Sequence, residues 1–335
     1  ATKSNLVRNN SNINQNLPSG ILLTQGANLT TIYGSNFMNH TQQNGIQIDG
    51  TGTNQNVVTG ATGGPFSTLH GNKTNGISIS LGPSNNVIWG AHSIQQNRLA
   101  GVRFNEAANN TVVGTTIREN GGGIELAGAP NSLVGQAGNG NTVIKNGTGI
   151  VVVDGTLTSD NVEIYANTVE DNNGAEIHAT DSQSIIIGAL GRGNSIRTCS
   201  GDSQLEAPNW SGIVLEETSD ANAHFNIVNG CRRGIFLDDT NGTTSLSNNR
   251  IINNTYEGIF AKDGDTLQIG PANRLDANRF GAHFESNSPT FNNNIVLNNR
   301  FGLVMRNTSA AQVNNNTFTN NRTDPIEPFQ PSDPG

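Results

Sequence analysis

The residues of this sequence whose types and spacing could do chemistry stand at fixed distances after a series of glycines. Each of these glycines precedes apolar residues, as in Gly234-Ile235. The fourth position after the glycine holds His178, Glu216, Asp238, Lys262, Glu285 and Arg306. The second position holds Glu176, Val214, Phe236, Phe260, His283 and Val304. Because residues two apart in a strand share a face, both sets are predicted to point outward from one sheet.

Aromatic rings flanked by hydrogen-bonding groups are typical of surfaces that bind sugars. The residues predicted to contact a glycan are Phe236, Phe260, His283, Trp210 and Arg306. Trp210 belongs to an insertion at residues 200–211, which could overhang the charged positions. The alternative is a solvated sheet face on which alternating charges stabilise the stacked strands.

The charged positions also offer candidates for catalysis, namely Asp238, Lys262, Glu216 and Glu285. A glycosidase needs two carboxylates about 5 Å or about 6.5–9.5 Å apart, and stacked acids give such distances along any sheet. A polysaccharide lyase needs a cation that neutralises a uronate together with a base. Lys262 beside Asp239 and Asp263 would fit that scheme.

Acidic residues also stand at the fifth position after these glycines. They are Glu217, Asp239 and Asp263, with Asp265 close by. Ca²⁺ takes six to eight oxygen ligands, and a cation would relieve the repulsion between stacked carboxylates. A Ca²⁺ site is therefore one prediction, and a simple turn at Asp263-Gly264 is the other.

The two cysteines, Cys199 and Cys231, occupy the same position in successive repeats. Stacked coils would place their Cα atoms about one strand spacing apart, which lies within disulfide range. A disulfide and two packed free thiols both remain open. No CxxC pair points to a redox or metal role.

A repeat organises the whole chain. The anchor glycines, most of them 21 to 26 residues apart, are Gly20, Gly45, Gly76, Gly101, Gly123, Gly149, Gly174, Gly212, Gly234, Gly258, Gly281 and Gly302. Apolar residues alternate within each repeat, which is strand spacing, and no window carries a helical stripe. Three short strands per repeat, stacked ~4.8 Å apart, predict an all-β, right-handed parallel β-helix of about twelve coils.

The predicted β-helix domain spans residues 1–322, and a Pro-rich tail or linker follows at 323–335. Asparagines recur in one column and are predicted to hydrogen-bond along the rod. The column comprises Asn72, Asn97, Asn120, Asn146, Asn172, Asn254, Asn278, Asn299 and Asn321. These asparagines are interpreted as architecture.

Composition excludes several classes of function. The net charge is −8 with 18 basic residues, and no basic cluster occurs, which argues against nucleic-acid binding. No apolar run approaches the ~20 residues that span a bilayer. Two cysteines and few lysines fit an exported protein, so an extracellular, cell-surface or periplasmic location is expected.

The segments Asn226-Ile-Val-Asn-Gly-Cys-Arg-Arg-Gly-Ile235 and Ile187-Gly-Ala-Leu-Gly-Arg-Gly-Asn-Ser-Ile196 carry a family resemblance. The pattern resembles the β-helix proteins of the pectin-lyase-like superfamily, and most of all NosD-like copper-processing proteins and bacterial surface β-helix repeats. The resemblance implies the fold. It leaves function open, because this fold hosts lyases, hydrolases, epimerases, adhesins and stalks.

The family's catalytic motifs are missing. The sequence has no Gly-His-Gly of polygalacturonases and no Tyr-Gly-x-Asp-Pro-His of alginate epimerases. We therefore expect a surface or structural module that binds a polysaccharide or cell-surface glycan. The alternatives are a lyase, epimerase or hydrolase of an acidic polysaccharide, and a self-associating filament subunit.

Overall fold

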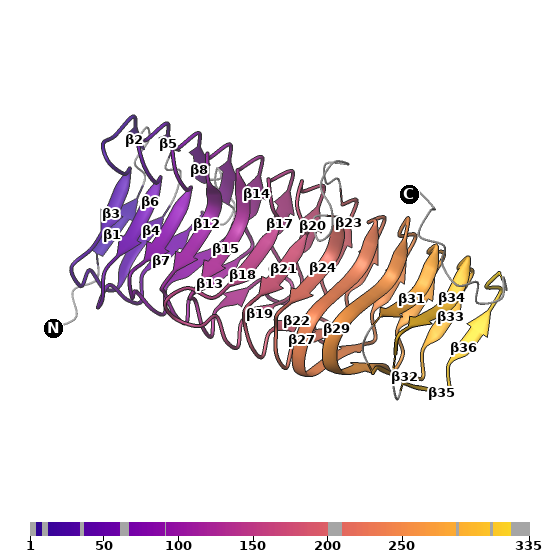
Figure 1. Ribbon diagram of the computed structural model, residues 1–335. Helices are drawn as coiled ribbons and strands as arrows, with labels where there is room; N and C mark the ends of the chain where they lie inside the picture. The colour runs from indigo at the N-terminus through magenta and orange to yellow at the C-terminus, as the bar shows by residue number, and fades with distance from the viewer. Residues whose placement is uncertain are drawn as a thin grey trace.

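The protein is a long solenoid built only of strands. The computed structural model describes residues 5–8, 13–33, 37–60, 67–90, 92–199, 210–285, 288–308 and 311–322, and this part contains no helix. Its coils, about twelve, follow one another in chain order along an elongated rod (Figure 1). The predicted parallel β-helix is confirmed. Residues 200–209 of the predicted insertion and the segment 323–335 lie outside the described residues.

Each coil contributes short strands to three series. The first series comprises β3 (Ile21–Leu23), β6 (Ile46–Asp49), β9 (Ile77–Ser80), β12 (Ala100–Asn105), β15 (Gly122–Ala127), β18 (Ile150–Val153), β21 (Ile177–Thr180), β24 (Ser211–Glu216), β27 (Arg233–Ser247), β29 (Glu257–Ile269), β31 (Phe280–Glu285) and β34 (Phe301–Arg306). The second series comprises β1 (Asn5–Arg8), β4 (Thr30–Tyr33), β7 (Val57–Thr59), β10 (Val87–Trp89), β13 (Thr111–Val113), β16 (Leu133–Val134), β19 (Glu163–Ile164), β22 (Ile186–Ile187), β25 (Asn222–His224), β32 (Thr290–Asn292) and β35 (Gln312–Asn314), with the later parts of β27 and β29.

The third series forms a separate sheet. It comprises β2 (Ile13–Asn14), β5 (Phe37–Asn39), β8 (Ser67–His70), β11 (His92–Gln95), β14 (Thr116–Arg118), β17 (Thr142–Ile144), β20 (Thr168–Glu170), β23 (Ser195–Arg197), β26 (Ile227–Asn229), β28 (Arg250–Ile252), β30 (Arg274–Asp276), β33 (Ile295–Leu297) and β36 (Thr317–Thr319). Neighbouring coils pair in parallel, so each residue lies over its counterpart one coil away.

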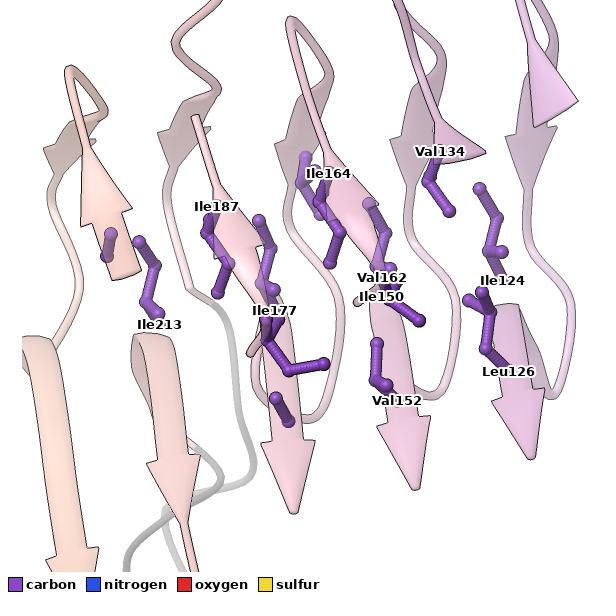
Figure 2. Packing of buried hydrophobic residues seen from close by; sticks show 14 of the residues in the cluster. Ile124, Leu126, Val134, Ile150, Val152, Val162, Ile164, Ile177, Ile187 and Ile213 are labelled. Carbon is purple, nitrogen blue, oxygen red and sulfur yellow. The ribbon is translucent and has the colours of Figure 1, made fainter. Parts of the chain in front are cut away.

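The core is a column of aliphatic side chains inside the rod. Alternation along each strand points every second residue inward, so Ile124 and Leu126 of β15 are fully buried while Glu125 between them faces outward. Figure 2 shows Ile164 and Ile187 stacked along the axis. No coil buries its apolar residues alone, and stability therefore depends on contact between neighbours.

The predicted asparagine ladder is confirmed. In each rung the backbone N–H and Nδ2 of one asparagine donate to the Oδ1 of the next, at 3.0 and 2.9 Å between Asn120 and Asn146. Nδ2 also donates to a buried backbone carbonyl, as Asn146 does to Ile117 O at 3.1 Å. A second ladder runs through Asn141, Asn167, Asn194, Asn226, Asn249, Asn273, Asn294 and Asn316.

Glycine is needed at most of the anchor positions because neighbouring coils come close there. A Cβ on Gly149 would lie 2.0 Å from the carbonyl oxygen of Glu176, and one on Gly76 would lie 2.3 Å from Ile94 Cγ2. No side chain fits at such distances. The glycine column is therefore a packing requirement.

The coil at residues 174–180 corrects the predicted register. Ile177 pairs with Ile150 and Ile213, so Glu176, not Gly174, occupies the glycine column. Glu176 is fully buried, and its predicted outward position was wrong. His178 shifts with it and lies beside Val214, in the second-position row, so its placement in the fourth-position row was also wrong.

Glu176 fills a gap in the first asparagine ladder. Asn172 donates to the Glu176 carboxyl from its backbone N–H at 3.1 Å and from Nδ2, where other rungs donate to an asparagine. The next coils carry the cysteines instead. Cys199 and Cys231 form a disulfide with Cα atoms 4.7 Å apart, and the backbone N–H of Cys231 resumes the ladder by donating to Asn254 Oδ1 at 3.0 Å.

Candidate functional site

A row of charged side chains runs along the outer face of the first strand series. Parallel pairing places Glu216, Asp238, Lys262, Glu285 and Arg306 one above another, on β24, β27, β29, β31 and β34. We call these five residues the charged stripe. Lys262 Nζ lies 2.7 Å from Asp238 Oδ2, so Asp238 neutralises the lysine that was predicted to neutralise a uronate.

Glu216 pairs with a residue of the preceding coil. Its Oε2 lies 3.1 Å from Nε2 of His178. Burial lowers the pKa of His178, and the hydrogen bond to Glu216 opposes this shift only in part. The imidazole is therefore mainly neutral at pH 7, and the contact is a hydrogen bond more than an ion pair.

The row beside the charged stripe is apolar and covered. Phe236 is 2% exposed and Phe260 is 8% exposed, so the expectation that both rings are exposed was wrong. Their side chains do point outward, but the rings stack on each other at 5.5 Å and the guanidinium of Arg233 lies over both, at 5.3 and 5.0 Å. With Ala175 and Val214 they form a small second hydrophobic cluster outside the rod.

A buried ion pair borders this cluster. Arg233 Nε lies 3.1 Å from Glu257 Oε2, and the Glu257 side chain is only 2% exposed. His283 Nδ1 lies 3.7 Å from Glu257 Oε1, which is too long for a hydrogen bond. Neither ring nitrogen of His283 has a hydrogen-bond partner in the described part of the chain. The ring of His283 lies 4.9 Å from that of Phe260.

Arginines and aromatic residues line the corner that leads into the first strand series. The residues two positions before the glycine column are Trp210, Arg232, Tyr256, Arg279 and Arg300, and we call them the corner column. Backbone hydrogen bonds from Arg232 to Trp210 and from Tyr256 to Arg232 hold successive members in register. The sequence carries this signal at the usual period before the glycine, whereas the predicted site residues other than Trp210 follow the glycine.

The acidic residues proposed for Ca²⁺ occupy turn positions. Glu217, Asp239 and Asp263 all have positive φ, between 43° and 49°. Asp181 of the neighbouring coil raises the pKa of Glu217 through a hydrogen bond and through its charge. Among the described residues, no three His, Cys, Asp or Glu side chains are placed to hold a metal ion. The side chain of Asp265 lies outside that part.

Family comparisons agree with this architecture. A model described as right handed beta helix region matches residues 66–201, and one described as periplasmic copper-binding protein (NosD) matches residues 191–325. The chain is a right-handed parallel β-helix of the pectin-lyase-like type. No helix in the described part of this β-helix is long and apolar enough to cross a membrane.

Solved structures of two epimerases share the β-helix along most of the chain. The periplasmic alginate epimerase AlgG is 12% identical, with a TM-score of 0.54 over 86% of this chain and 76% of AlgG. The A-module of the Azotobacter vinelandii mannuronan C-5 epimerase AlgE6 is 13% identical, with a TM-score of 0.55 over 87% of this chain and 86% of the module. At these identities the likeness concerns the fold alone. No curated protein matches the sequence.

Proposed function

We propose that this β-helix is a cell-surface or periplasmic module that binds polysaccharide along the charged stripe. The observation that carries the proposal is the register of the stripe, which repeats hydrogen-bonding side chains at every coil from Glu216 to Arg306. A linear polymer lying along the rod would meet one such group per coil, about every 4.8 Å. Epimerases of the same fold, by their names, act on alginate and mannuronan, which supports a polysaccharide as the ligand.

Lys262→Ala is expected to weaken polysaccharide binding about tenfold, because one charge-assisted hydrogen bond contributes roughly 1.5 kcal/mol. Calorimetric titration with alginate, polygalacturonate, dextran sulfate and neutral dextran measures the effect. Lys73→Ala, which removes an exposed lysine from the N-terminal half, is the matched control and should leave affinity unchanged. Thermal unfolding checks that both variants fold. Binding to none of the four polymers, or an equal loss in the control, would reject the proposal.

A uronate-modifying enzyme is the second candidate. The observation that favours it is His283, whose ring nitrogens have no partner in the described part and which lies beside the Arg233–Glu257 pair. A guanidinium can neutralise a uronate carboxylate while an imidazole accepts a proton. If this candidate holds, the chain converts or cleaves alginate and His283→Gln abolishes turnover. Absence of unsaturated ends, new reducing ends and epimerised units would reject it.

Copper binding is not part of the proposal, although one matching family model names copper. Copper sites use imidazole and soft sulfur ligands. Here both cysteines are consumed in the disulfide, and no group of three suitable side chains converges among the described residues. The residues that the structure describes therefore do not fit a copper site.

A further inference from the structure

In the corner column, the guanidinium groups of the arginines lie over aromatic rings. The guanidinium of Arg232 lies 5.2 Å from the ring centroid of Trp210 and 5.7 Å from that of Tyr256. The guanidinium of Arg279, one coil beyond Tyr256, lies 4.6 Å from the ring centroid of Tyr256. Arg300 lies 5.3 Å from the ring of Phe301. Stacking against a ring fixes the plane of a guanidinium but leaves the N–H groups along its edge available for a planar anion.

Arg232 and Arg300 of the corner differ from Arg233 and Lys262 of the same face in what neutralises them. Arg233 and Lys262 each contact a carboxylate, at 3.1 and 2.7 Å. In the part of the chain that the structure describes, no carboxylate lies within 4.0 Å of Arg232 or Arg300. The corner is therefore suited to an external anion.

The spacing of the arginines along the rod indicates how long an anion must be to contact more than one of them. Successive members of the column are one coil apart, so Arg232 and Arg300, which are separated by three coils, lie about 14 Å apart along the axis. One pyranose ring of an extended chain has a length comparable to one coil. A polymer with an acidic group on most of its sugars can thus meet Arg232 and Arg300 at once, with Tyr256 between them as a surface for a ring.

We propose that the corner column is a binding strip for a linear anionic glycan that runs parallel to the rod axis. The inference rests on the proposed function in taking a polysaccharide as ligand. It adds a set of residues outside the charged stripe and a requirement for negative charge on the polymer. The ligand chemistry is an anionic group on each sugar, and either a uronate carboxylate or a sulfate ester would supply it.

The test is the double variant Arg232→Gln/Arg300→Gln, titrated with an oligouronate, dextran sulfate and neutral dextran. We expect affinity for at least one anionic polymer to fall roughly 100-fold, about tenfold per lost charge-assisted bond, and the salt dependence of binding to become shallower. Affinity for dextran should not change. Whether the oligouronate or the sulfated polymer responds identifies the anionic group. Arg98→Gln removes an exposed arginine near the same corner of an earlier coil and should have no effect.

Several outcomes would overturn the inference: no anionic polymer binds, the double variant loses dextran binding equally, Arg98→Gln has the same effect, or single-stranded DNA competes as well as the glycan. Arg232→Lys guards against a misfolded double variant, because it keeps the charge and loses the planar fork. It should lose part of the affinity for the anionic polymer. Dextran binding that depends on Lys262 but not on the arginines would leave the proposed function intact while the corner inference fails.

Discussion

Asn146→Ala is expected to lower the free energy of unfolding by about 2–6 kcal/mol, since it leaves two buried N–H donors of Asn120 without their acceptor and each such group costs about 1–3 kcal/mol. The substitution removes the acceptor of two hydrogen bonds from Asn120, at 3.0 and 2.9 Å. It also removes the side-chain donor to the buried carbonyl of Ile117. Urea unfolding followed by circular dichroism measures the loss.

Asn173→Ala is the matched control, because Asn173 is exposed and its side chain belongs to no ladder. We expect a change within about 0.5 kcal/mol for that variant. Equal stabilities of Asn146→Ala and Asn173→Ala would show that the ladder does not hold the coils together.

Glu176→Gln is expected to remove a pH dependence of stability. Burial raises the pKa of Glu176 to about 8, well above its ordinary value of 4.5. The folded protein therefore binds this proton more tightly than the unfolded chain. The stabilisation is complete below about pH 4.5, falls as the pH rises toward 8, and is lost above that, with a maximum near 5 kcal/mol. At pH 9 the glutamine variant should be the more stable protein.

The measurement is the difference in unfolding free energy between wild type and Glu176→Gln from pH 4.5 to pH 9. Taking the difference cancels the titration of all other groups. Glu119→Gln, at an exposed position, should give a flat difference over the same range. A flat difference for Glu176→Gln as well would mean that the carboxyl does not stay protonated where it replaces a rung of the ladder.

The fold could be predicted because its period is carried by residues that packing does not allow to vary. A side chain at Gly76 or Gly149 would collide with the next coil, and Asn146 must match both neighbours to pair along the axis. These requirements recur in every coil, so they appear in the sequence as a repeat. The strand direction and the ladder follow from them.

The coil of Glu176 could not be placed from the sequence. Gly174 stands two residues before the true position and satisfies the pattern, while a buried carboxyl in a glycine column contradicts it. The reason lies in a neighbouring coil, where Cys199 has no amide oxygen to accept the bonds of Asn172. Such compensation between distant residues leaves no periodic signal.

The sequence predicted which side chains of the candidate site point outward, but not which of them other side chains cover. Alternation correctly placed Phe236 and Lys262 on the outer face, yet it could not show that Arg233 lies over the phenylalanine. Arg232 and Arg300 were missed because their positions precede the glycine, whereas the rows predicted to face outward follow it. Their stacking on aromatic rings emerges only when the coils are superposed.

Hydroxyl-radical footprinting tests the central claim, that polysaccharide binds along this side of the C-terminal coils, most directly. The chain is oxidised with and without bound alginate oligomers, and the modification of single side chains is read by mass spectrometry. Tyr256 of the corner column should become protected, whereas Trp89, which is 40% exposed on β10, should react equally in both samples. Protection of Trp89 with Tyr256 unchanged would place the ligand elsewhere and contradict the account.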